Sequence, residues 1–90
     1  MATIHIRVVG KVQGVGFRWY VRVSARRLQL SGWVRNVKDG SVEIVASGAE
    51  DRLSDLRKLI ARGPDGAEVA ELIDLDVVQD DLDYPFAMRK

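Results

Sequence analysis

The 90-residue chain is 47% hydrophobic, and this length and composition are typical of one globular domain with a single core. The absence of cysteine excludes a disulfide framework, a thiolate nucleophile and a thiol zinc site. Basic side chains outnumber acidic ones eight to two in residues 1–45, whereas acidic ones outnumber basic ones eleven to six in residues 46–90. An anionic ligand is therefore expected to be attracted to the first half of the chain.

The first predicted elements are a strand and a helix. Residues 3–9, TIHIRVV, alternate isoleucine and valine with His5 and Arg7, which is the two-residue period of a half-buried strand. After a glycine-containing loop, apolar side chains recur at the spacing of a helix that ends at LSG, residues 30–32. The predicted apolar stripe consists of Phe17, Val21, Ala25 and Leu28, widened by Trp19 and Val23, while Arg22, Arg26 and Arg27 are expected to face solvent.

A hairpin and a second helix are predicted next. The segments 33–36, WVRN, and 41–46, SVEIVA, are expected strands joined by VKDG, whose Asp-Gly pair tolerates the positive φ angles of a tight turn. Ser47 and Glu50 have the spacing of a capping box at the start of a helix. Glycine and proline in RGPDG, residues 62–66, end that helix. Its apolar side is formed by Leu53, Leu56, Leu59 and Ile60.

Two further strands are predicted, at residues 67–78 and 85–89, and Pro85 fits only the start or the edge of the second. The resulting order is β-α-β-β-α-β with a late extra strand. This order predicts one domain over residues 1–90 with a split-βαβ, or ferredoxin-like, α+β fold. In that arrangement the sheet is largely antiparallel, and both amphipathic helices pack on one of its faces.

The loop GKVQGVG, residues 10–16, leaves a strand and enters a helix. Such a junction presents unpaired backbone N–H groups at the positive end of the helix dipole, which favours an anion. Glycines allow successive N–H groups to converge on a ligand, because no Cβ blocks its approach. Arg18 adds a permanently charged bidentate donor suited to phosphate. The loop is a candidate phosphate site, although loop chemistry alone fits a plain tight turn with a surface arginine equally well.

Other phosphate and nucleic-acid motifs fit the same segment less well. GVGFRW begins like a dinucleotide fingerprint, but Trp19 occupies the position of its third glycine, and 90 residues cannot complete that fold. The Gly-Lys-Ser/Thr ending of a Walker-type loop is absent. An RNA-binding sheet carries its aromatic side chains on central strands, whereas Phe17, Trp19 and Tyr20 fall in the loop and the first helix.

Two segments closely resemble the signature motifs of the acylphosphatase family. GKVQGVGFR, residues 10–18, matches the pattern G-x-V-Q-G-V-x-F-R throughout. GWVRNVKDGSVEIVASG, residues 32–48, matches the second signature, with asparagine at 36 and with Gly40, Val42 and Gly48 at the family's spacing. The tail PFAMRK is similar to the family's closing F-x-I-R strand, with Met88 in place of isoleucine.

This resemblance implies an enzyme that hydrolyses carboxyl-phosphate mixed anhydrides to a carboxylate and inorganic phosphate. It implies that Asn36 positions the attacking water and that Arg18 is the second catalytic residue. An acyl phosphate has a good leaving group, so positioning and charge stabilisation are expected to suffice without a strong general base. The phosphate-binding loop implied by the match consists of Val12, Gln13, Gly14, Val15, Gly16, Phe17 and Arg18.

The expected partners are a small-molecule acyl phosphate as substrate and inorganic phosphate as product and inhibitor, with no cofactor and no metal ion. A second hypothesis is an acylphosphatase-like binding module for carbamoyl phosphate, as found at the start of large carbamoyl-transfer proteins. A ferredoxin-like nucleic-acid binder is a third, which the net charge of +1 disfavours. No apolar run approaches the roughly 18 residues of a membrane span, and the start lacks the apolar region of a signal peptide, so a cytoplasmic monomer without membrane contact is expected.

The remaining polar candidates are interpreted structurally. His5 alternates with isoleucines and is expected to lie on a sheet face rather than to act as a phosphorylated nucleophile. Trp19, Tyr20 and Trp33 are expected to pack against the site or to flank it. A solvated acidic edge without calcium-loop spacing is expected for Asp74, Asp76, Asp80, Asp81 and Asp83.

Overall fold

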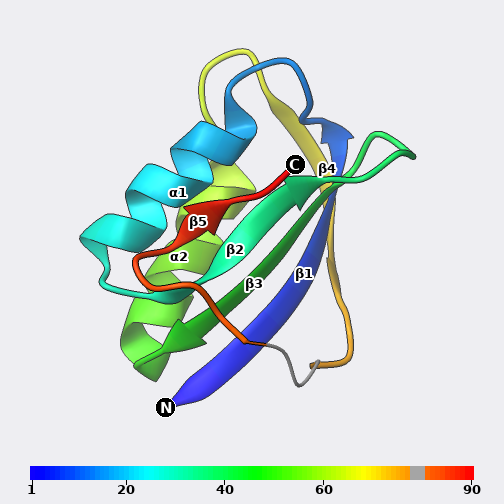
Figure 1. The fold of residues 1–90 in the computed structure, drawn as a ribbon. Coiled ribbons are helices and arrows are strands. Elements are labelled where there is room, and N and C mark those ends of the chain that lie inside the picture. The colour runs from blue at the N-terminus through cyan, green and yellow to red at the C-terminus, as the bar shows by residue number, and fades with distance from the viewer. Residues whose placement is uncertain (78–80) are drawn as a thin grey trace.

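The computed structural model describes residues 1–77 and 81–90, which form two helices packed on one face of a five-stranded sheet (Figure 1). The sheet order is β4-β1-β3-β2-β5, and every neighbouring pair is antiparallel except β2 and β5, which are parallel. This is the predicted ferredoxin-like α+β fold. Its elements are β1 (Ala2–Lys11), α1 (Phe17–Arg27), β2 (Ser31–Asn36), β3 (Val42–Gly48), α2 (Glu50–Arg62), β4 (Glu68–Asp74) and β5 (Ala87–Met88).

The core lies between the sheet and the two helices. The strand register places Ile6 opposite Ile44 and Ile44 opposite Val34, so alternate residues of three adjacent strands face the helices together. The helical spacing read from the sequence places Phe17 and Val21 of α1 on the same side, and all five side chains are almost completely buried. Removal of this apolar surface from water is the main source of stability for so small a chain.

The opposite face of the sheet carries a polar cluster centred on the buried side chain of His5, which confirms its prediction as a sheet-face residue. His5 Nε2 lies 2.6 Å from Glu43 Oε2, and Nδ1 lies 2.7 Å from the carbonyl oxygen of Asp76. Arg35 also donates to Glu43, at 2.7 Å. Burial raises the pKa of Glu43, but the hydrogen bonds from His5 and Arg35 outweigh burial and leave this pKa below its usual range.

The predicted capping box at the start of the second helix is wrong. Strand β3 continues to Gly48, and the N-cap residue of α2 is Ala49, which has an extended backbone and no side-chain cap. The Ser47 hydroxyl donates instead to the carbonyl oxygen of Ala2 and accepts from Thr3 Oγ1, both at 3.0 Å. Ser47 is paired with β1 and β2 within the sheet, and this long-range pairing overrides the local capping signal.

The two C-terminal strands are shorter than predicted. β4 ends at Asp74, and β5 contains only Ala87 and Met88. The last predicted residue of the fourth strand, Val78, lies outside the described residues. Among the residues that the structure describes, no helix is long and apolar enough to span a membrane.

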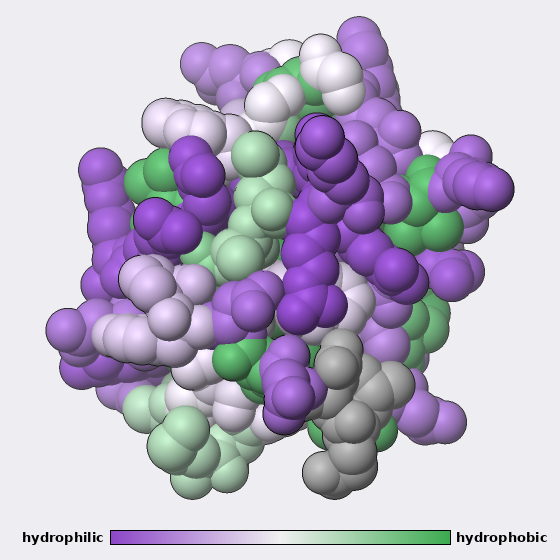
Figure 2. Space-filling view, in the orientation of Figure 1, coloured by the Kyte–Doolittle hydropathy of each residue, from purple (hydrophilic) through white to green (hydrophobic). Residues whose placement is uncertain are grey.

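Exposed charges cover much of the surface, and hydrophilic residues predominate on the face shown in Figure 2. In the acidic segment, Asp74 pairs with Arg57 at 2.6 Å and Asp83 pairs with Arg89 at 3.2 Å. Asp80 lies outside the described residues. Within residues 1–77 and 81–90, no group of three or more histidine, cysteine, aspartate or glutamate side chains is arranged to hold a metal ion.

Candidate active site

The glycines of the first loop have two different structural roles. Gly14 and Gly16 both have φ near 75°, in the left-handed region, and a Cβ on either would meet no atom within 4 Å. Glycine is therefore required there by the backbone angle rather than by space. Gly10 has φ 138° and lies at a register shift between β1 and β4, where a Cβ would be 2.1 Å from the carbonyl oxygen of Glu68. Gly10 permits the close approach of β4, so only the other two glycines shape the loop itself.

The left-handed turn at Gly16 starts helix α1. Gly16 is the N-cap residue, with no side-chain cap, and its carbonyl oxygen accepts from the N–H of Tyr20 at 3.0 Å. The N–H groups of residues 16–19 therefore have no acceptor within the helix. The first turn of α1 contains no acidic residue. The positive end of the helix dipole is thus left available to an anion.

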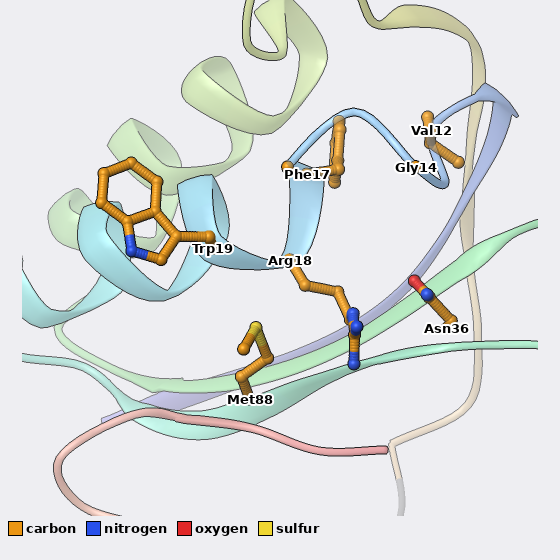
Figure 3. Close-up of a pocket in the computed structure, with 8 residues that line it drawn as sticks. Val12, Gly14, Phe17, Arg18, Trp19, Asn36 and Met88 are labelled. Carbon is orange, nitrogen blue, oxygen red and sulfur yellow. The ribbon is translucent and has the colours of Figure 1, made fainter.

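A cavity of about 230 Å³ opens at this helix terminus (Figure 3). Arg18 has the only charged side chain among the described residues that line it, so no carboxylate or histidine is present there to act as a general base. The cavity brings together six of the eight predicted site residues with two others. Its lining consists of Val12, Gly14, Gly16, Phe17, Arg18, Trp19, Asn36 and Met88.

Arg18 and Asn36 reach this cavity from different elements. The Arg18 side chain extends from the first turn of α1, and its Nη1 donates to the carbonyl oxygen of Arg89 at 2.9 Å. This hydrogen bond fixes the guanidinium against the chain that follows β5. Asn36 is the last residue of β2 and is half-buried, and no hydrogen bond holds its carboxamide to another described residue. In Figure 3 both side chains point into the same space.

Gln13 and Val15, the other two predicted loop residues, do not line the cavity. Gln13 Nε2 donates to the carbonyl oxygen of Val37 at 2.7 Å and to that of Ser41 at 2.9 Å. The carboxamide thereby joins the loop to the β2–β3 hairpin, directly beside Asn36. Val15 packs against the core. Both residues are placed to hold the loop in position rather than to contact a ligand through their side chains.

The three aromatic residues expected near the site lie in different places. Trp19 does not extend the buried stripe of α1, because its side chain is 57% exposed at the mouth of the cavity. The Tyr20 hydroxyl donates to the carbonyl oxygen of Leu59 at 2.7 Å and so connects α1 with α2. Trp33 is buried on the opposite sheet face, with the guanidinium groups of Arg35 and Arg89 over its ring. Only Trp19 lines the cavity.

Met88 was not singled out from the sequence as a site residue. It lies opposite Val34 in the parallel β2–β5 pair and reaches the cavity from there. Its side chain is 40% exposed, as an apolar residue at a cavity mouth would be. The sequence around Met88 gives little indication of this placement, because the pairing of Met88 with Val34 joins residues more than fifty positions apart.

Comparison with known proteins identifies the family of this chain. The acylphosphatase family model matches residues 4–85. An acylphosphatase of Pseudomonas aeruginosa is 54% identical over 67 residues, which are 74% of each chain. The crystal structure of the acylphosphatase from Bacillus subtilis has a TM-score of 0.87 and 33% identity, with both chains fully covered.

The same fold also occurs as a small part of a longer protein. The structure of T. kodakarensis HypF matches 98% of this chain with a TM-score of 0.84 and 29% identity, but the match covers only 12% of HypF. The family model spans most of the chain, and the Pseudomonas relative shares more than half of its aligned residues. The chain therefore belongs to the acylphosphatase family.

Proposed function

We propose that this protein hydrolyses acyl phosphates to a carboxylate and inorganic phosphate in the cavity at the N-terminus of α1. The observation that carries the proposal is the composition of this one cavity. It joins a helix terminus with free N–H groups, the Arg18 guanidinium and the Asn36 carboxamide, and none of the described residues that line it is anionic. Family membership supports the same reaction.

Phosphate binding is assigned to the loop and to Arg18. The N–H groups of residues 14–19 and the helix dipole favour a dianionic phosphoryl group. The guanidinium supplies two parallel donors, and its hydrogen bond to the Arg89 carbonyl oxygen restricts its orientation. Because the loop is also hydrogen-bonded to the hairpin through Gln13, the phosphate donors and Asn36 are held in one frame.

The chemical step is assigned to a water molecule oriented by Asn36. The amide oxygen of Asn36 accepts a hydrogen bond from this water, and the amide nitrogen can donate toward the phosphoryl group. The water oxygen forms a bond to phosphorus while the bond from phosphorus to the acyl oxygen breaks and its electron pair remains on the departing carboxylate. One proton of the water passes to a phosphoryl oxygen of the substrate, because none of the described side chains that line the cavity is a carboxylate or histidine that could accept it.

The direct test is phosphate release from benzoyl phosphate by the purified protein. We expect turnover that persists after exhaustive chelation, since the guanidinium and the N–H groups supply the positive charge that a metal ion would otherwise provide. The Arg18→Ala variant, shown to be folded by circular dichroism, is the control for contaminating phosphatases. Absence of turnover, or turnover that a chelator abolishes and a divalent metal restores, would contradict the proposal.

A second candidate is a module that binds carbamoyl phosphate without hydrolysing it. The observation that favours this candidate is the match to a small part of the much longer HypF. The two functions differ in one measurable respect. A binding module would bind carbamoyl phosphate in a calorimetric titration and release no phosphate from it or from benzoyl phosphate.

A further inference from the structure

A second cavity lies beside the phosphate site, on the outer side of the helices. It has a volume of about 440 Å³, which is within the range of small-molecule pockets and is larger than the phosphate cavity. Its lining is mainly apolar and aromatic, and it consists of Trp19, Tyr20, Val23, Leu28 and Leu59 together with Ser24 and Arg27. None of the described residues that line it is acidic, so these residues do not repel an anionic substrate.

Trp19 connects the two cavities. Among the residues that the structure describes, it alone lines both, and its side chain is 57% exposed. A large aromatic ring left in solvent at the mouth of a binding site provides a contact surface for an apolar ligand. The lining residues on this side extend from Trp19 in α1 to Leu28, the C-cap residue of that helix, and nine positions along a helix correspond to about 13.5 Å.

The geometry of phosphoryl transfer determines where the acyl group lies. The attacking and leaving oxygens are roughly in line through phosphorus. In Figure 3, Asn36 lies on one side of the Arg18 side chain, and Trp19 lies on the other. With the water at Asn36 and the phosphate at Arg18, the acyl oxygen departs on the side of Trp19 and Met88. The acyl group therefore points toward the second cavity.

Two residues that line this cavity are joined by a hydrogen bond between the helices. The Tyr20 hydroxyl of α1 donates to the Leu59 carbonyl oxygen of α2 at 2.7 Å. The Phe17 and Tyr20 rings are in contact, with centroids 6.2 Å apart. Because Phe17 lines the phosphate cavity and Tyr20 lines the second one, this ring contact lies between the two sites.

We propose that this second cavity is the acyl subsite, and that it makes the protein selective for acyl phosphates with an aromatic or medium-length hydrocarbon acyl group. This inference rests on the proposed function, because the acyl group is placed relative to the phosphate position proposed there. Trp19 covers the start of the acyl group, and Val23, Leu28 and Leu59 contact the part beyond it. Short acyl phosphates such as acetyl phosphate reach only the rim formed by Trp19 and Met88.

The test uses two non-hydrolysable analogues, phenacylphosphonate and acetonylphosphonate, which share the phosphonate and differ in the apolar group. Calorimetric titration of the wild-type protein should give a dissociation constant about tenfold lower for the phenyl compound. Trp19→Ala and Val23→Gln should each remove most of this difference. Val77→Gln, the same substitution at an exposed valine outside both cavities, should preserve it.

The ratio of kcat/KM for benzoyl phosphate to that for acetyl phosphate should follow the same pattern in the four proteins. Trp19→Phe should restore the preference that Trp19→Ala loses, because a ring again covers the entrance. A wild-type protein without preference, or a preference that survives in both Trp19→Ala and Val23→Gln, would overturn the acyl subsite while leaving acyl phosphate hydrolysis intact. Failure of both phosphonates to bind, together with no turnover of either substrate, would overturn the proposed function and the subsite with it.

Discussion

The two helices begin in opposite ways, although neither has a side-chain N-cap. Helix α2 has Glu50 and Asp51 in its first turn, and the Asp51 carboxylate accepts from the N–H of Arg52 at 2.9 Å. Helix α1 starts at a left-handed glycine, has no acidic residue in its first turn and opens into a cavity. The positive end of the α2 dipole is therefore offset by acidic side chains of α2 itself, whereas the positive end of the α1 dipole remains available to an external anion.

This difference supports the proposal that the N-terminus of α1 is the functional helix end. Acidic residues near a helix N-terminus are stabilising, so their absence at α1 forgoes a stabilising interaction. A carboxylate there would occupy the position of the phosphate or repel it. Arg18 adds positive charge at the same end, where a cation is unfavourable for the helix alone. The missing acidic residue and the additional positive charge of Arg18 have one explanation if the phosphoryl group of the substrate is the anion that binds at this end of the helix.

The largest expected effect is the loss of Arg18, which removes the charged donor that distinguishes the α1 terminus. We expect Arg18→Ala to lower kcat/KM by about 10³-fold or more and to weaken phosphate inhibition, since the guanidinium is proposed to contact the phosphoryl group throughout the reaction. Arg18→Lys should recover little, because an ammonium cannot reproduce two parallel donors. Wild-type kinetics for Arg18→Lys would show that charge alone suffices.

Asn36→Ala separates anion binding at α1 from the chemical step. Because the carboxamide is assigned to the water, kcat should fall by about 10²–10³-fold while the inhibition constant of inorganic phosphate stays nearly unchanged. Steady-state kinetics with phosphate as inhibitor measure both quantities. Circular dichroism must first show a folded variant, since Asn36 borders the β2–β3 hairpin. Equal losses of phosphate binding in this variant and in Arg18→Ala would refute the division of roles.

Trp19→Glu makes the α1 terminus resemble that of α2 by placing an acid in the first turn. We expect the inhibition constant of phosphate to rise about tenfold relative to Trp19→Gln, because the added carboxylate repels the anion at close range. The neutral glutamine variant controls for the lost indole. The difference should shrink as the salt concentration is raised. Identical phosphate binding by the two variants would mean that the anion lies elsewhere.

The smallest effect concerns α2. Glu50→Gln and Asp51→Asn should each lower the free energy of unfolding by about 0.3–1 kcal/mol at low salt, because each removes a negative charge from a helix N-terminus. Neither should change kcat or phosphate inhibition, since α2 begins away from the cavity. Urea denaturation with parallel activity assays tests both statements. A lower kcat or weaker phosphate inhibition in either variant would contradict the claim that only the N-terminus of α1 takes part in the reaction.

Much of this contrast can be predicted from the sequence, because the decisive features are local. The left-handed glycines, the arginine after them and the apolar spacing of α1 all lie within residues 14–25. The two signature segments also identify Asn36, although nothing local connects it with the loop. Secondary-structure order then gives the ferredoxin-like arrangement that brings these parts together.

The features that could not be predicted depend on pairing between distant segments. Glycine is needed at position 10 because the backbone of β4 approaches it at Glu68. The sequence near Gly10 does not indicate that these two segments pair. Met88 and the carbonyl oxygen of Arg89 reach the site only through the parallel pairing of β5 with β2. Ser47 carried a strong local signal for a cap, yet its place within the sheet gave its hydroxyl other partners.

The most direct test of the central claim is an NMR titration of the ¹⁵N-labelled protein with inorganic phosphate, with chloride at matched ionic strength as the control. Saturable shifts are expected for the amide signals of residues 14–19, where the N–H groups are proposed to bind the anion. No shifts are expected for residues 50–52, at the start of α2. Shifts of similar size and affinity at both helix ends, or none at residues 14–19, would contradict phosphate binding at the N-terminus of α1.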